Sequence, residues 1–462
     1  MAAGCDGFGD LGEIAEDEAE AHVRGVCFKT GPPERIGVEL EWLVQDRSDP
    51  RELISVDRLD AALAPVEAPG ALPRGSRITR EPGGQVELSS APAPALGACI
   101  EAMAADLAVL REAADRAGLV LVGQGLDPFR EPPRVLDHPR YRAMESFFDR
   151  EGPWGRTMMR RTASLQVNLD CGDDSPGVTG HRYRWALAHR IGPVLVAAFA
   201  NSPFRSGRPT GWLSTRQDIW SRMDPGRTRH PRHHPDPGTA WAGYALDARL
   251  LCIRQPGDGD GQARGAGGAG AAGGAPAADW SAPDGLTFRG WLRGTVPGLR
   301  RPTLADLDYH LSTLFPPVRP RGWLELRMID AQDGDDWIVP AVLAATLMDD
   351  PVAADAAWAA TEPLCPTGGP LPGPGQVPEE DSVTDPADPL PSDEVWRRAA
   401  RIGLADPDLA KAARTCFAAA ESALARSGAP AALRLALAGF AERYPERGRC
   451  PADDQLDALS RA

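Results

Sequence analysis

The sequence predicts a fold that combines α-helices with a β-sheet, and three observations lead to this prediction. Strand-like and helix-like segments alternate between residues 35 and 345. Four of the strand-like segments place polar and apolar residues at alternate positions, which is typical of strands with one buried face. Hydrophobic residues make up 42% of the 462 residues, which is enough for a substantial core.

The first of these segments, RIGVELEWLV, carries two carboxylates on one face. Val38, Leu40 and Trp42 alternate with Glu39 and Glu41. Residues two apart on a strand point to the same side, so the two glutamates are neighbours. An exposed face would tolerate this pair, because antiparallel sheets often have one solvated face. That explanation weakens if the pattern recurs in other strands.

The same alternation does recur in three later segments, EPGGQVELSS, RTASLQVNLD and RGWLELRMID. Each has carboxylates, amides or an arginine on one face and apolar residues on the other. Glu81 is the first residue of EPGGQVELSS and is separated from its strand-like part by a Pro-Gly-Gly turn. The polar faces contain Gln85, Glu87 and Ser89, then Gln166, Asn168 and Asp170, and finally Glu325 and Arg327.

If the four strands share one sheet, their acids gather on one face. The acids are Glu39, Glu41, Glu81, Glu87 and Glu325. Two carboxylates about 7 Å apart repel each other by roughly 2 kcal/mol at an effective dielectric constant of about 20. Oxygen ligands without Cys or His favour Mg²⁺ or Mn²⁺. Such a metal beside an arginine is typical of phosphoryl transfer from a nucleotide.

Composition excludes several other classes of function. The formal net charge of −15 argues against a nucleic-acid or anionic-membrane partner. The chain has no run of about eighteen apolar residues, so we expect no membrane span. The N-terminus is acidic and lacks an apolar core, unlike a secretory signal. The eight cysteines are scattered without a CxxC pair, which predicts a cytoplasmic protein with reduced thiols.

Several longer motifs resemble one known family. GVELEW, ITREPGGQVELSSAP, TASLQVNLD, FANSPFRSGRPTGWLSTRQDIW, YALDARL and HLSTLFPPVRPRGWLELR occur in the order and spacing of the glutamate–cysteine ligase family. The sequence is most similar to the plant-like branch and to the bacterial enzymes that begin ergothioneine synthesis. The resemblance runs from about residue 34 to 350 and then fades.

This resemblance implies both a fold and a reaction. The fold would be α+β and related to glutamine synthetase, with a curved antiparallel sheet that forms a funnel, helices behind it and a small helical C-terminal part. In the reaction, ATP would phosphorylate the γ-carboxyl of L-glutamate, and the amine of L-cysteine would attack the acyl phosphate. The implied cofactor is Mg²⁺ or Mn²⁺, with ATP as co-substrate.

The resemblance also assigns roles to individual residues. Gln166 stands where other branches have His, so it either completes the metal set or contacts the nucleotide. Arg327 corresponds to the catalytic arginine beside the transferring phosphate, and Arg216 to the arginine that holds glutamate. Tyr244 is expected to line the cysteine pocket, and Asn168 to contact substrate. The residues that correspond to the family's metal-binding set are Glu39, Glu41, Glu81, Glu87, Gln166 and Glu325.

Other readings of the same residues remain open. Without its motif, Arg216 would be interpreted as a helix-surface arginine, and Tyr244 as a core aromatic. The chain could also be a carboxylate–amine ligase of this fold with a different amine acceptor, or a non-catalytic relative that binds nucleotide. The sequence does not indicate an oligomeric state.

Composition divides the chain into segments. Gly/Ala-rich and Pro/Gly-rich stretches cannot build a core, so they predict an insertion and a linker. The predicted segments are a mobile acidic N-terminal tail over 1–33, a catalytic domain over 34–360 with a disordered Gly/Ala insertion at 255–279, a Pro/Gly/acidic linker over 361–393, and a helical C-terminal region over 394–462.

Overall fold

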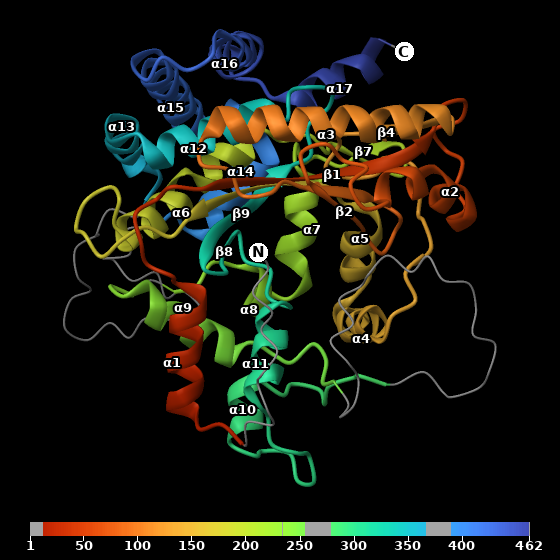
Figure 1. Ribbon diagram of the computed structural model, residues 1–462, viewed down its shortest axis with the longest axis vertical. Helices are drawn as coiled ribbons and strands as arrows, with labels where there is room; N and C mark the ends of the chain where they lie inside the picture. The colour runs from red at the N-terminus through yellow and green to blue at the C-terminus, as the bar shows by residue number, and fades with distance from the viewer. Residues whose placement is uncertain (1–12, 233, 255–278, 366–389, 462) are drawn as a thin grey trace.

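One seven-stranded sheet lies between two layers of helices in the computed structural model of this protein (Figure 1). The structure describes residues 13–232, 234–254, 279–365 and 390–461. The predicted Gly/Ala insertion and most of the predicted linker lie outside these residues. The mixed α/β architecture, with an antiparallel sheet and a helical C-terminal part, is confirmed.

The sheet joins strands from both ends of the catalytic region. Its order is β2-β3-β1-β5-β9-β8, with β4 paired to the far end of β1, and every pairing is antiparallel. The four strands predicted from alternation are therefore neighbours in one sheet. The strands are β1 (Ile36–Asp46), β2 (Arg77–Arg80), β3 (Val86–Ser89), β4 (Leu119–Val122), β5 (Ser164–Asp170), β8 (Val318–Pro320) and β9 (Trp323–Asp330), and a separate hairpin is formed by β6 (Phe204–Arg205) and β7 (Arg208–Pro209).

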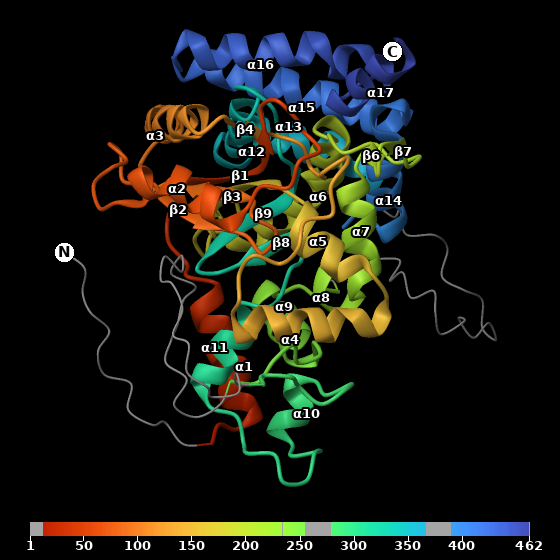
Figure 2. The same ribbon diagram turned by 90° about the vertical axis from the view of Figure 1, so that its right-hand side faces the viewer.

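The apolar face of the sheet packs against one helical layer. Val38, Leu88, Val167 and Leu326 are fully buried, and they belong to a core that includes side chains of α3, α6 and α12. Figures 1 and 2 show α3, α12, α15 and α16 on this side of the sheet, and α4, α8, α9 and α11 on the opposite side. The second face of the sheet, which carries the acids, therefore faces the second helical layer.

The helices that precede β8 lie on both sides of the sheet. In α3, Ile100 and Leu107 are buried, and Gly118 follows the helix with a φ of +66°, as a C-terminal glycine should. The helices are α1 (Glu16–Cys27), α2 (Val56–Glu67), α3 (Leu96–Arg116), α4 (Pro139–Phe148), α5 (Trp154–Arg161), α6 (His181–Ala198), α7 (Thr215–Met223), α8 (Pro225–Thr228), α9 (Pro237–Asp247), α10 (Phe288–Leu292) and α11 (Leu304–Leu311).

The C-terminal helices share the main core rather than forming a separate body. Phe417 and Phe440 stack on each other, and both contact Phe199, which follows α6. The predicted helical C-terminal region is thus continuous in packing with the rest of the fold. These helices are α12 (Ile338–Asp349), α13 (Pro351–Thr361), α14 (Asp393–Ile402), α15 (Pro407–Arg426), α16 (Ala431–Arg443) and α17 (Pro451–Arg461).

The predicted N-terminal tail over 1–33 is wrong for its second half. Residues 16–27 form α1, and its Ala19, Val23 and Cys27 are buried in the core. These three residues are four apart, so they lie on one side of a helix, while acidic residues cover the other side. The acidic composition favoured a tail, whereas the apolar stripe favours a helix that packs on the core.

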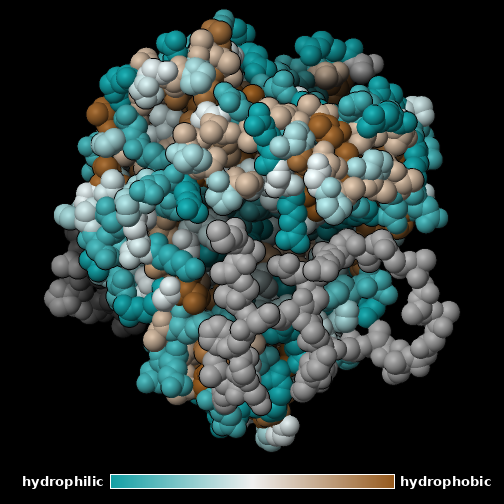
Figure 3. All heavy atoms as spheres, viewed as in Figure 1, coloured by the Kyte–Doolittle hydropathy of each residue, from teal (hydrophilic) through white to brown (hydrophobic). Residues whose placement is uncertain are grey.

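Hydrophilic side chains predominate on the face in Figure 3, and strongly hydrophobic ones are scattered among them. Within the described ranges, no helix has the length and apolar character needed to cross a bilayer.

Candidate active site

The register of the sheet places the predicted polar residues side by side. Glu41 lies opposite Glu87 on β3, and Glu39 lies opposite Gln166 on β5. On the other side of β5, Asn168 lies opposite Glu325 on β9. Because directly opposed side chains in antiparallel pairs have Cβ atoms about 5 Å apart, these residues form one continuous polar surface.

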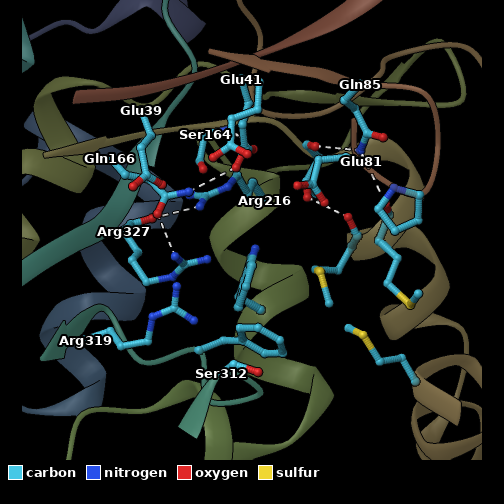
Figure 4. A pocket seen from close by; sticks show the side chains of 18 of the residues that line it. Glu39, Glu41, Glu81, Gln85, Ser164, Gln166, Arg216, Ser312, Arg319 and Arg327 are labelled. Carbon is cyan, nitrogen blue, oxygen red and sulfur yellow. Dashed lines mark hydrogen bonds between the residues drawn. The ribbon is translucent and has the colours of Figure 1, made fainter. Parts of the chain in front are cut away.

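This surface forms one wall of a cavity of about 270 Å³. The other walls come from α4, α5, α7 and the segment after α11. Of the predicted site residues, seven line the cavity, namely Glu39, Glu41, Glu81, Glu87, Gln166, Arg216 and Arg327. Figure 4 shows Glu41 and Glu81 pointing into it from above, with Arg319 and Arg327 on the opposite side.

Four glutamates, which we call the acid side, occupy one part of the cavity: Glu39, Glu41, Glu81 and Glu87. Their hydrogen bonds come from neutral donors. Glu41 accepts from the Ser164 backbone N–H at 2.7 Å and from Gln166 Nε2 at 3.1 Å. Glu39 accepts from Asn168 Nδ2 at 2.9 Å, and Glu87 accepts from the Thr79 hydroxyl.

Burial and mutual repulsion raise the pKa values of three of these acids. Burial, followed by the charge on Glu41, raises the pKa of Glu81 to about 7. Burial, followed by the charges of Glu39, Glu81 and Glu41, holds the pKa of Glu87 well above its usual range. Burial and the charge on Glu325 raise the pKa of Glu39. The acid side therefore has more negative charge than the nearby cations neutralise.

A tight hairpin turn places Glu81 at the edge of this group. The Glu81 N–H donates to the Gln85 carbonyl at 2.9 Å, and Gln85 Nε2 donates to the Thr162 carbonyl at 2.8 Å, next to β5. A Cβ atom on Gly83 would lie 2.1 Å from the Arg160 carbonyl oxygen, so only glycine fits there. The Pro-Gly-Gly turn thus allows the Glu81 hairpin to pack directly against α5.

The opposite part of the cavity, which we call the arginine side, is lined by Arg319, Arg321 and Arg327, and the buried Glu325 lies beside them. Arg319 lies opposite Glu325 in the β8–β9 pairing and donates to both of its carboxylate oxygens, at 2.6 and 3.1 Å. Arg327 Nη1 donates to Glu325 at 2.8 Å and to Gln166 Oε1 at 2.6 Å. Burial alone raises the pKa of Glu325, but the charges of Arg319 and Arg327 outweigh it and hold that pKa well below its usual range.

Glu325 is paired with arginines in this structure, and its role as a metal ligand stays a prediction. Its side chain is fully buried, it does not line the cavity, and both of its oxygens accept hydrogen bonds from guanidinium groups. Its position suits it to hold Arg319 and Arg327. The prediction missed Arg319 and Arg321, although the sequence contained a signal. In VRPRGWLE, a turn at Arg321–Gly322 between alternating residues places Arg319 opposite Glu325.

Arg216 is a buried side chain of the cavity wall, not a helix-surface arginine. It lies in the first turn of α7, and its side chain is 3% exposed. Its Nη2 donates to the Arg327 carbonyl at 2.8 Å, whereas its Nη1 is buried and has no hydrogen-bond partner among the described residues. That nitrogen lies 3.6 Å from Asp330 Oδ1, and a guanidinium in a cavity wall is suited to an anionic ligand.

Two predicted substrate-binding residues do not reach the cavity. Tyr244 lies on α9, stacks on Trp241 with ring centroids 5.2 Å apart, and is absent from the cavity wall. Asn168 is taken up by neighbours, since its Nδ2 donates to Glu39 at 2.9 Å and its Oδ1 accepts from Trp323 Nε1 at 3.0 Å. Tyr244 is thus a packing aromatic, and Asn168 orients Glu39.

The donors on the acid side fit a hard divalent cation. Carboxylate and amide oxygens are the ligands that Mg²⁺ and Mn²⁺ prefer, and excess negative charge favours their binding. Among the described residues, no three acidic, His or Cys side chains converge closely enough to hold an ion in the present arrangement. Small rotations of side chains that are held by neutral donors would be needed to bring the oxygens together.

A cavity that pairs a carboxylate face with buried arginines, on an antiparallel sheet, is suited to an enzyme that handles anionic substrates. Residues 35–371 match the model of glutamate–cysteine ligase family 2. The chain belongs to this family, and it is a ligase.

Individual relatives agree with this assignment. The chain is 39% identical to the glutamate–cysteine ligase EgtA of Mycobacterium tuberculosis, over 97% of this chain and 91% of that protein. It is 31% identical to the chloroplastic glutamate–cysteine ligase of Arabidopsis thaliana, over 59% of this chain and 49% of that protein. Among solved structures, the glutamate–cysteine ligase of Francisella tularensis in complex with AMP aligns with a TM-score of 0.46 and 10% identity, over 93% of this chain and 85% of that one.

Proposed function

We propose that the protein joins the γ-carboxyl of L-glutamate to the amine of L-cysteine, with ATP converted to ADP and phosphate. The observation that carries this proposal is the division of one cavity into an acid side and an arginine side. A carboxylate does not react with an amine at neutral pH until it is activated. Phosphorylation activates it, and a cavity with a metal-binding face and several arginines suits that step.

Different residues of the cavity are suited to bind glutamate, the phosphates of ATP and the metal ion. Arg216, whose guanidinium lies in the cavity wall, is suited to bind a carboxylate of glutamate. Arg319, Arg321 and Arg327 line the cavity together, and Glu325 fixes two of them, so they are suited to neutralise charge on the phosphates. The acid side would hold Mg²⁺, which supplies charge neutralisation on the nucleotide when bound. The residues for it are Glu39, Glu41, Glu81 and Glu87, with Gln166 beside them.

The reaction then takes two steps. A γ-carboxylate oxygen of glutamate attacks the terminal phosphorus of ATP, the bond to the bridging oxygen breaks, and ADP leaves with that electron pair. The cysteine amine attacks the acyl carbon, and phosphate leaves while the amine loses a proton. Arg327 is placed to stabilise the charge that moves during the first step.

The similarity to EgtA over nearly the whole chain supports a role in ergothioneine biosynthesis. Deleting the gene in its own host should abolish ergothioneine, and added γ-glutamylcysteine should restore it. An unchanged ergothioneine content in the deletion strain would contradict this role.

Incubation of the purified chain with ATP, Mg²⁺, L-glutamate and a panel of amines tests the reaction. Phosphate release should require both glutamate and cysteine, and mass spectrometry should detect γ-glutamylcysteine. A faster reaction with another amine would identify a different carboxylate–amine ligase. Binding of nucleotide without phosphate release, with every amine, would identify a non-catalytic relative.

A further inference from the structure

Asp330, the last residue of β9, is a buried carboxylate that the proposed mechanism does not use. It is 2% exposed and does not line the cavity. Its Oδ2 accepts hydrogen bonds from the Asn201 N–H at 2.9 Å and the Ser202 hydroxyl at 2.7 Å. Its Oδ1 accepts from the Ser214 hydroxyl at 2.9 Å. A buried carboxylate with three donors is held in a single orientation.

The group that Asp330 faces is Arg216. Arg216 Nη1 lies 3.6 Å from Asp330 Oδ1, which is beyond hydrogen-bond distance but close enough for a strong charge interaction. The Ser202 hydroxyl, which donates to Asp330, also accepts from the Arg216 backbone N–H at 3.2 Å. Asp330 therefore acts on both the backbone and the guanidinium of Arg216.

The donors of Asp330 come from two loops, and the C-terminal helices hold both. The Ala400 carbonyl in α14 accepts from the Ser214 N–H at 2.8 Å, just before α7. In α17, Gln455 Nε2 donates to Asn201 Oδ1 at 2.5 Å. The last 60 or so residues of the chain therefore reach the cavity indirectly, through these loops and Asp330.

The space around the Asp330 carboxyl is fixed as well. A Cβ atom on Gly125 would lie 2.5 Å from the Asp330 Cγ, so the backbone of Gly125 packs directly on the carboxyl group. A longer carboxylate at position 330 has no room, and an isosteric amide is the appropriate replacement.

We propose that Asp330 is the positioning residue that sets the orientation of Arg216 in the cavity, and that α14 and α17 stabilise this arrangement through Ser214 and Asn201. The inference rests on the proposed function, in which Arg216 binds a carboxylate of glutamate. It assigns to the C-terminal helices a part in substrate binding, although none of their residues lines the cavity.

Steady-state kinetics of D330N test the inference. The glutamate KM should rise about tenfold, while kcat and the KM values for ATP and cysteine change less than threefold, because mainly ground-state binding is lost. D127N is the matched control, since Asp127 is a buried carboxylate that accepts from Arg130 Nε at 2.8 Å and lies outside this cavity. A glutamate KM within twofold of wild type in D330N would overturn the proposal.

A double-mutant cycle separates positioning from general stability. If Asp330 acts through Arg216, then R216A combined with D330N should have the same glutamate KM as R216A alone. Additive effects would overturn the proposal. If D330N does not fold, S202A keeps the carboxylate and removes one donor, and its glutamate KM should rise about threefold. An unchanged KM in folded S202A would equally overturn it.

A crystal structure of D330N gives a readout that does not depend on the reaction. The Arg216 guanidinium should leave the Arg327 carbonyl, and its retention in place would overturn the inference. Failure of the proposed function looks different, because wild type would then release no phosphate while the Arg216 displacement in D330N still occurs. Q455A tests the contribution of α17: its glutamate KM should rise by two- to threefold, and an unchanged value would remove the C-terminal helices from the proposal.

Discussion

The acid side and the arginine side of the cavity lie on the same face of the same sheet, yet their charges are balanced very differently. On the arginine side, Glu325 accepts hydrogen bonds from two arginines, and its pKa is held well below its usual range. On the acid side, the carboxylates are bonded to neutral groups, and burial raises the pKa of Glu81 and Glu87. The protein itself balances the charge of Glu325 on the arginine side, whereas it does not balance the charges of the glutamates on the acid side.

This difference distinguishes carboxylates that stabilise the structure of the site from carboxylates that are suited to bind a cationic ligand. A buried carboxylate that is paired with cations belongs to the scaffold, because removing it leaves unpaired charges. A buried carboxylate without cations costs free energy in the folded protein, and a ligand can recover it. The same residue type in neighbouring strands therefore has two opposite roles.

The largest expected effect is that of Glu41→Gln on activity. The change removes a charged ligand of the acid side, so ATP-dependent ligation should fall by at least about three orders of magnitude, or roughly 4 kcal/mol. The melting temperature should stay equal or rise, because one repulsive charge is lost. The exposed α3 residue Glu101, changed to Gln, provides the control. Near-normal turnover of Glu41→Gln at saturating Mg²⁺ would remove this residue from the metal set.

The matching change on the arginine side should have the opposite effect on stability. Glu325→Gln leaves Arg319 and Arg327 without their shared carboxylate, so the free energy of unfolding should fall by about 3 to 5 kcal/mol. Chemical denaturation of the two Glu→Gln variants, side by side, measures this. Equal stabilities would show that the two sides do not differ as their contacts indicate.

Arg327→Ala tests the arginine side during the reaction itself. The guanidinium should matter most when charge moves to the transferring phosphoryl group, so kcat should fall by two to three orders of magnitude, or about 3 to 4 kcal/mol. The exposed α15 residue Arg414, changed to Ala, is the control. A change in the KM values with an unaltered kcat would place Arg327 in ground-state binding alone.

The smallest expected effect concerns pH and sharpens the comparison on the acid side. The pKa of Glu81 is raised from its usual 4.5 to about 7 in the folded protein. Between these values the folded state binds more protons than the unfolded state, so stability without metal falls as pH rises from about 4.5 to 7, by at most about 3 kcal/mol. Mg²⁺ should therefore stabilise the protein more at pH 8 than at pH 5. Thermal melts of wild type and Glu81→Gln measure this, and identical pH slopes would contradict it.

Alternation along the strands was enough to predict which face carries the acids, because a strand has only two faces. It did not predict which acids have cationic partners, because that depends on pairing between distant strands and on the β8–β9 turn. Glu325 looked like Glu39 in sequence, and only the register with Arg319 separates them. Arg140 and Met144 of α4 line the cavity too, but their helix gave no signal that one face meets a site.

Tyr244 illustrates a second limit of the sequence. Its motif was recognisable, but the position of α9 relative to the sheet depends on packing with α1, and α1 itself was interpreted as part of a tail. Arg216 was placed correctly because its motif leads directly into the first turn of α7, next to β9.

The strand order has a consequence for the newly synthesised chain. β1 and β3 are made early, whereas β9, which brings Glu325 and Arg327, leaves the ribosome only after about two-thirds of the chain has been translated. The central strand β5 then has an unpaired edge while β9 is missing, and unpaired edges invite contacts with other chains. The docking of α17 follows that of β9 and would add the contact between Gln455 and Asn201. Premature termination between residues 331 and 454 would thus yield a chain that contains every acid of the cavity but lacks its finished support.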